Sequence, residues 1–302
     1  MIIFIAPGEL EPLKNKYYGR WLTLCNILIK KKLKAKIITS NFIHSTKDYY
    51  ETKDELFTVF NCGGYEKNIS FKRQLYNAVF CAKVLRWMFL NRVGLKGAVI
   101  VFNSIPPELA IAAYFSRLFG AKVVVDVRDL WPEALGVDEN KSMLFSTWSF
   151  YAKTLTYWIL NQSITQYYTS GTYEKVLDKN KMKFTPLGVD SARWEKSNQP
   201  EINSDNSRLI LGYIGNNAKQ YNLSFVFDAM KSSKHLLKII GLHPVEVRRQ
   251  YPWVDFMGYM KGTNVIDETN NWHIAILPDM TYSGVGLPVS YTHLTLPTKR
   301  IV

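Results

Sequence analysis

Short apolar segments alternate with amphipathic segments along most of the chain, and this alternation constrains the fold more than any other feature. Ile2–Ala6 is an apolar run that ends in Pro-Gly, a helical pattern with an apolar face follows it, and Lys36–Thr39 is again apolar. A strand, a helix and a strand in this order form a βαβ unit, which requires a parallel sheet covered by helices. The alternation then recurs at residues 71–92, 98–102, 107–119 and 122–127. We therefore expect an α/β protein with a doubly wound parallel sheet.

A polar stretch at Ser191–Ser207 interrupts the alternation. It contains Pro200 and lacks apolar periodicity, as an interdomain linker does. A second alternating series follows, and 302 residues are enough for two domains of ordinary size. We expect two Rossmann-like domains, one over residues 1–190 and one over residues 208–288, joined by the linker 191–207.

The second series stops early. Four strands are expected before the run Gly284–Pro288, whereas a doubly wound domain would continue with a helix, a strand and a helix. The last residues, 289–302, read VSYTHLTLPTKRIV, contain Pro297 and have no helical period. This string is similar to translated sequencing-adaptor read-through. We expect a non-native tail after an incomplete C-terminal domain; an authentic terminal strand is the alternative.

The chain is basic, with 38 Lys and Arg against 25 Asp and Glu and a formal charge of +13. Such a charge favours phosphate-rich partners: nucleic acid, an anionic membrane surface or a phosphorylated substrate. The basic and aromatic helix at residues 71–92 either covers the sheet with a cationic outer face or lies on an anionic membrane. No recognisable nucleic-acid-binding module is evident, so we expect no nucleic-acid partner.

The first residues, Met1–Pro7, are typical of a strand, so we expect no signal peptide there. The sequence contains no apolar run long enough to span a membrane. Cys25, Cys62 and Cys81 are widely spaced and form no CxxC pair, which indicates neither a disulfide framework nor a zinc site. We expect a cytoplasmic protein, either free or peripheral at the inner face of the plasma membrane.

The segment Val123–Gly136, VVVDVRDLWPEALG, carries the densest set of candidate catalytic side chains. A buried parallel strand brings charged side chains to its carboxyl end, where open α/β sheets bind ligands. These are Asp126, Arg128, Asp129 and Glu133. An Arg–Asp pair that only stabilises the turn is the alternative, and spacing does not choose between the two. An arginine between two carboxylates is also a poor site for a divalent cation, so we expect no metal.

This segment closely resembles the signature D-(I/V)-R-D-L-W-P-E of family 4 glycosyltransferases that build bacterial surface polysaccharides, including fucosaminyltransferase-like members. Further segments are similar to other conserved parts of that family, and the resemblance extends over residues 1–288. These segments are Ile37–Ser45 (IITSNFIHS), Thr185–Asp190 (TPLGVD), Leu211–Gly215 (LGYIG) and Tyr282–Pro288.

The resemblance implies a GT-B fold and a retaining transferase that moves a sugar from a nucleoside-diphosphate sugar to a saccharide or polyprenyl-diphosphate-linked acceptor, without a cofactor or an obligatory metal. It implies catalytic roles for Arg128, Asp129 and Glu133. It also implies substrate-binding roles for Gly19, Arg20, His44, Gly215, Asn216, Lys219, Tyr282, Ser283, Gly284 and Gly286.

The chain departs from the family pattern after Gly215. Many members carry Arg and Lys there, whereas this chain has Asn216 and Tyr221, so either Lys219 or backbone amides at a helix start would meet the diphosphate. The resemblance implies an acidic residue beyond Leu287 that holds the donor, and we expect it to be missing here. Two alternatives stay open: a nonhydrolysing sugar-nucleotide epimerase of the same fold, and an inactive fragment of the transferase.

Overall fold

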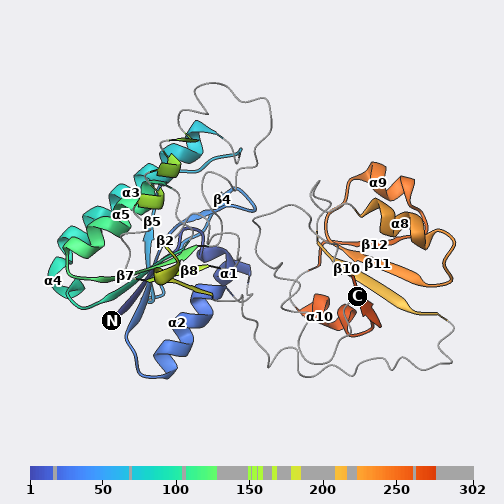
Figure 1. Ribbon diagram of the computed structural model, residues 1–302, viewed down its shortest axis with the longest axis horizontal. Helices are drawn as coiled ribbons and strands as arrows, with labels where there is room; N and C mark the ends of the chain where they lie inside the picture. The colour runs from blue at the N-terminus through green and yellow to red at the C-terminus, as the bar shows by residue number, and fades with distance from the viewer. Residues whose placement is uncertain are drawn as a thin grey trace. The chain divides into compact units, whose positions relative to one another are not determined.

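A computed structural model of the chain shows two compact units, Met1–Pro186 and Leu187–Val302, which we describe separately (Figure 1). The domain boundaries expected at residues 190 and 208 stay predictions. The structure describes residues 1–15, 19–67, 70–103, 107–127, 149–150, 152–154, 156–158, 165–168, 178–184, 208–215, 223–260 and 263–276.

The first unit is built on a seven-stranded parallel sheet with the strand order β5-β2-β1-β6-β7-β8-β9. The chain therefore starts in the middle of the sheet, moves to one edge and then builds outward on the other side. The strands are β1 Ile2–Ile5, β2 Ala35–Ser40, β5 Phe57–Phe60, β6 Val99–Asn103, β7 Lys122–Val127, β8 Thr165–Tyr168 and β9 Met182–Phe184. A short antiparallel hairpin, β3 Phe42–Ile43 with β4 Asp48–Tyr49, follows β2.

Helices cover both faces of this sheet (Figure 1). Because successive side chains of a strand point to opposite faces, Ile3 and Ile5 of β1 join one core, whereas Phe4 joins the other. The core around Phe4 is completed by α1 Leu10–Asn15 and α2 Arg20–Lys30. The core around Ile3 is completed by α3 Phe71–Leu90, α4 Arg92–Leu95 and α5 Pro107–Leu118. Residues 149–150, 152–154 and 156–158 are also helical, and the short 3-10 helix η3 is Lys179–Lys181.

The second unit contains a four-stranded parallel sheet with the order β12-β11-β10-β13. Its core centres on Phe227, whose ring packs against Tyr251 and Phe256. The elements are β10 Ile210–Ile214, α8 Ser224–Met230, β11 Leu236–Ile240, α9 Val245–Gln250, β12 Asp255–Gly258, α10 Thr263–Thr269 and β13 Ile274–Ala275. The strand order again starts in the middle, so both units are doubly wound and Rossmann-like, and the predicted α/β class is confirmed.

The tail predicted at residues 289–302 lies outside the described residues. Across the described part of the chain, none of the helices combines the length and the apolar character that crossing a bilayer requires.

Candidate functional site

The carboxyl ends of β1, β6 and β7 meet where the strand order of the first sheet reverses. Asn103 ends β6 and is in register with Asp126 of β7. Next to them, β1 ends at Ile5 and continues into a turn that contains Gly8, whose φ of +90° is in the left-handed region, and then Glu9. Ligands of open α/β sheets bind at this position, so the residues gathered here form the candidate site of the first unit.

Glu9 occupies the amino end of α2. Its carboxylate Oε1 accepts hydrogen bonds from the backbone N–H groups of Trp21 (3.0 Å) and Leu22 (2.9 Å), and its own N–H donates to Thr39 Oγ1 (3.2 Å). Glu9 is buried. The first-turn amides of a helix attract phosphate groups when they have no internal partner. In α2, two of these amides already bind a carboxylate of the chain itself.

Gly19 and Arg20 lie against this carboxylate and the end of β7. A Cβ on Gly19 would be 2.5 Å from Glu9 Oε1 and 2.5 Å from Pro12 Cγ, so only glycine fits. The Arg20 guanidinium lies 3.2 Å from Asp126 Oδ2 and 5.1 Å from the centre of the Trp21 ring. Asp126 is buried, whereas Arg20 stays partly exposed. The structure thus brings two predicted substrate-binding residues to the reversal point of the sheet and gives both a structural contact there.

His44 lies apart from this group, in the turn between β3 and β4. Its Nδ1 is 2.9 Å from the Tyr65 hydroxyl and 3.1 Å from Lys47 Nζ. Lys47 and the Arg73 guanidinium lie 4.8 Å and 5.6 Å from the centre of the Tyr65 ring. Partial burial, together with Lys47 and Arg73, lowers the pKa of His44. The imidazole is therefore neutral at pH 7 and is bordered by two cations.

Gly215 follows β10 at the carboxyl edge of the second sheet. Its N–H donates to the Ile240 carbonyl (2.9 Å), and its own carbonyl accepts from His243 Nε2 (3.1 Å). A Cβ on Gly215 would be 2.2 Å from the Tyr213 hydroxyl. This glycine therefore joins the ends of β10 and β11.

His243 was not predicted as a site residue. It is buried, and its Nδ1 has no hydrogen-bond partner within the described part of the chain. Burial, followed by Arg248, lowers the pKa of His243, although the hydrogen bond to Gly215 acts in the opposite direction. Because Nε2 donates to a carbonyl, the neutral ring has its acceptor at Nδ1. The feature that could have identified His243 is its position three residues after β11, which ends beside Gly215.

The predicted catalytic residues Arg128, Asp129 and Glu133 lie outside the described residues. The same holds for Asn216, Lys219, Tyr282, Ser283, Gly284 and Gly286. Among the side chains that are described, no group of three or more His, Cys, Asp or Glu is placed to hold a metal ion.

No protein-family model matches the sequence, and no curated protein matches it. Solved structures do match. HepE of Anabaena, in complex with UDP and glucose, is 11% identical with a TM-score of 0.59 over 99% of this chain and 79% of HepE. A UDP-forming α,α-trehalose-phosphate synthase from Burkholderia vietnamiensis is 10% identical with a TM-score of 0.57 over 97% of this chain and 80% of the synthase.

The chain has the GT-B fold. A protein named UDP-N-acetylglucosamine 2-epimerase, from Listeria monocytogenes, is also similar, with 8% identity and a TM-score of 0.51 over 91% of this chain and 73% of that protein. Identities of this size show a shared fold, and the chemistry must be argued from the residues.

Proposed function

We propose that the chain is a glycosyltransferase that moves a sugar from a nucleoside-diphosphate sugar to a saccharide acceptor. The observation that carries the proposal is the D-V-R-D-L-W-P-E run at residues 126–133, which resembles a glycosyltransferase signature. The shared fold with HepE, which was solved with UDP and glucose, is compatible with the same chemistry.

The second unit would bind the donor. Gly215 ends the first strand of its sheet, and the backbone amides that follow such a strand commonly meet a phosphate. Asn216 and Lys219 would complete this diphosphate site, and the loop with Tyr282, Ser283, Gly284 and Gly286 would hold the sugar and nucleotide. His243 donates to the Gly215 carbonyl from Nε2 and offers a buried acceptor nitrogen, Nδ1, beside this turn.

The first unit would bind the acceptor and carry the catalytic groups Arg128, Asp129 and Glu133. Arg20, held by Asp126, is a cation at the carboxyl edge of that sheet, and His44 lies farther along the chain beyond β2. We propose a retaining transfer in which the leaving phosphate assists deprotonation of the acceptor, because the sequence offers no evident carboxylate pair of the glycosidase kind. No cofactor and no obligatory metal enter this scheme.

The family resemblance favours an aminohexose-type donor and a polyprenyl-diphosphate-linked acceptor in bacterial surface-polysaccharide synthesis. Such an acceptor would place the enzyme at the cytoplasmic leaflet of the plasma membrane. An epimerase is the second candidate, favoured by the similarity to the Listeria protein. It would act on the sugar nucleotide alone, whereas a transferase requires an acceptor.

A screen of nucleotide sugars against lipid-linked acceptors tests the proposal, with nucleoside-diphosphate release as the readout. We expect release that depends on the acceptor, and an NMR spectrum of the product with the anomeric configuration of the donor. Asp129→Asn and Glu133→Gln should each lower turnover about tenfold or more while the melting temperature stays unchanged.

Three other results have distinct meanings. A sugar nucleotide that changes configuration without an acceptor would identify an epimerase. Donor binding in calorimetry without turnover would identify an inactive fragment of the transferase. If no nucleotide sugar binds at all, the proposed function is wrong.

A further inference from the structure

The helix α3 is apolar on its outer side as well as on its inner side. Buried residues such as Phe80 and Val84 form the side that packs on the sheet. The outward positions, three or four residues apart, are also mostly apolar: Phe71, Leu75, Ala78, Ala82 and Phe89. Phe71 is 82% exposed. A helix that covers a sheet in a soluble protein normally turns a polar face to water, so this outer side needs a partner.

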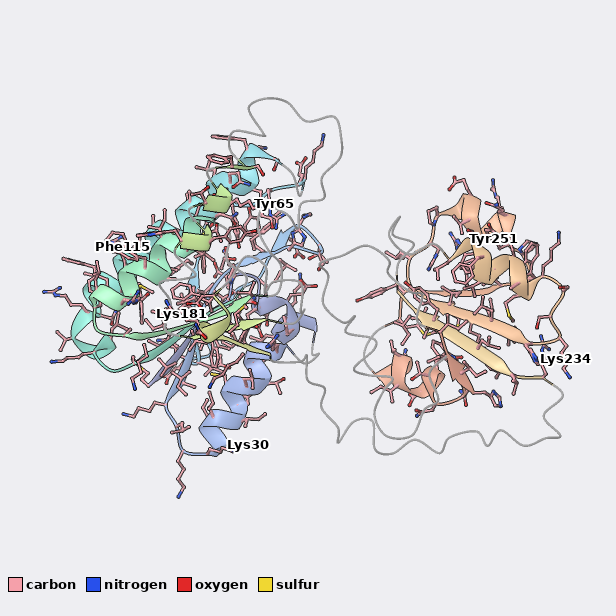
Figure 2. All side chains as sticks on the ribbon, in the orientation of Figure 1. Lys30, Tyr65, Phe115, Lys181, Lys234 and Tyr251 are labelled. Atoms are coloured by element: carbon pink, nitrogen blue, oxygen red, sulfur yellow. The ribbon has the colours of Figure 1, made fainter. Side chains whose placement is uncertain are left out.

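The neighbouring helices extend the same surface (Figure 1). Val93 of α4 is 87% exposed, and α5, which packs beside α3, exposes Ile111, Phe115 and Leu118 at helical spacing. Phe115 is labelled in Figure 2 on this side of the unit. We call the exposed set the apolar face: Phe71, Leu75, Phe89, Val93, Phe115 and Leu118.

The charges around the apolar face are all positive in α3 and α4. From Lys67 to Pro107 the chain has seven basic residues and no acidic one. The basic residues are Lys67, Lys72, Arg73, Lys83, Arg86, Arg92 and Lys96. Lys72, Arg86 and Arg92 are exposed, and the Arg92 guanidinium lies 4.9 Å from the centre of the Phe89 ring. Cations and apolar side chains are therefore interleaved on one surface.

We infer that the apolar face docks on the surface of an anionic lipid bilayer. Exposed Phe and Leu side chains enter the region between headgroups and acyl chains, while neighbouring Lys and Arg contact anionic headgroups. A second copy of the chain would bring like charges together, and a nucleic acid would leave Leu75, Val93 and Leu118 without an apolar partner. The inference rests on the proposed function for why a bilayer is near, since a lipid-linked acceptor would lie in one.

Co-sedimentation of the full chain with vesicles tests the charge requirement. We expect binding to phosphatidylglycerol–phosphatidylcholine vesicles and much weaker binding to phosphatidylcholine alone. The double variant Lys72→Gln with Arg86→Gln should weaken binding roughly 25-fold, because each cation near an anionic leaflet contributes roughly a fivefold factor. The control, Lys30→Gln with Lys31→Gln, makes the same charge change at the end of α2, on the opposite face of the sheet, and should have a much smaller effect.

A pair of matched apolar variants tests the insertion. Phe89 is 57% exposed in α3, and Phe225 is 60% exposed in the second unit. Phe89→Ser should weaken vesicle binding several-fold, whereas Phe225→Ser should leave it unchanged. Circular dichroism then shows whether each variant keeps its fold, as expected for exposed positions.

A fluorescent label reports insertion into the bilayer directly, without a variant that weakens vesicle binding. The native thiols Cys25, Cys62 and Cys81 are buried, and burial raises the pKa of each to about 11, so an added surface cysteine is labelled selectively. An environment-sensitive dye on Val93→Cys should shift to the blue with anionic vesicles, and the same dye on Phe225→Cys should not.

Absence of binding to anionic vesicles would overturn the inference. Equal vesicle binding by the wild type, by the Lys72→Gln/Arg86→Gln variant and by Phe89→Ser would also overturn it. The same holds if the chain does not bind vesicles but forms a dimer that Phe89→Ser dissociates. Transfer to a soluble acceptor without vesicle binding would overturn this inference alone. Vesicle binding by a chain that binds no nucleotide sugar would instead overturn the proposed function alone.

Discussion

At the start of α2, Gly19 packs so closely against the Glu9 carboxylate that a larger residue would not fit. Glu9 accepts two backbone N–H groups of the first turn, and Gly19 lies directly against its carboxylate. The contact holds the loop after β1 against the helix, next to the Arg20–Asp126 ion pair. The geometry of the first unit's candidate site therefore depends on a residue that contributes no functional group.

Replacement of Gly19 by alanine should destabilise the first unit by about 1–3 kcal/mol, the usual cost of a side chain forced into packed atoms. The Cβ would displace Glu9 or Pro12, and urea unfolding measures the loss. Gly94→Ala is the control, since a Cβ there meets no atom within 4 Å and Gly94 lies in α4. The control should be neutral or slightly stabilising. Equal destabilisation by both variants would show that the contact with Glu9 is unimportant.

His243 should make the second unit less stable in acid. Its pKa is lowered from the ordinary value of 6.5, so between the folded and unfolded pKa values the unfolded chain binds more protons. The contribution to the free energy of unfolding is complete above pH 6.5 and is lost as the pH falls toward the folded pKa. His243→Gln should flatten this part of the pH profile in calorimetry. His44→Gln, in the first unit, should leave the second unit's profile unchanged.

The elements were predictable where the apolar pattern is dense. Val123, Val124 and Val125 in β7 form a continuous apolar run, typical of a strand buried on both faces, and the predicted range 122–127 matches β7. The short edge strand β5 was missed, because FTVF follows a polar stretch and has no helical partner directly before it. The six-residue helix α9 was missed as well, since it has no buried residue and thus no apolar stripe.

The candidate site was predictable only where local sequence determines it. Gly215 was predicted as a substrate-binding residue from the family resemblance; the structure places it directly after β10, and its binding role stays a prediction. The contact of Arg20 with Asp126 joins residues more than a hundred positions apart, and no local pattern specifies such a pair. His243 was missed for the same reason, because its role depends on β10 and β11 ending side by side.

The strand β10 should be intolerant of any side chain at Gly212. A Cβ there would lie 1.9 Å from the Trp272 ring, which packs directly on the strand. Gly212→Ala should therefore destabilise the second unit by about 1–3 kcal/mol in urea unfolding. Trp272→Leu should lower the free energy of unfolding less in the Gly212→Ala variant than in the wild type, because the alanine side chain and the Trp272 ring compete for the same space. Simple additivity would contradict the proposed contact.

At the scale of the whole molecule, the two units have separate cores. The buried residues around Ile3 and Phe4 belong to the first unit, and those around Phe227 belong to the second. We expect two calorimetric transitions, since each unit has its own sheet and covering helices. Gly19→Ala should lower the midpoint of one transition, and Gly212→Ala that of the other. A single transition shifted equally by both variants would show that the units unfold as one.

The strand order also bears on how the chain folds while the ribosome is still making it. In each sheet, every strand after the first pairs with a strand that comes earlier in the chain: β2 and β6 with β1, and β11 and β13 with β10. Along the described strands, none has to wait for a later one before it finds a neighbour. Synthesis from the N-terminus can therefore add the strands one by one to a growing sheet, which limits the time that an unpaired apolar edge stays open to aggregation.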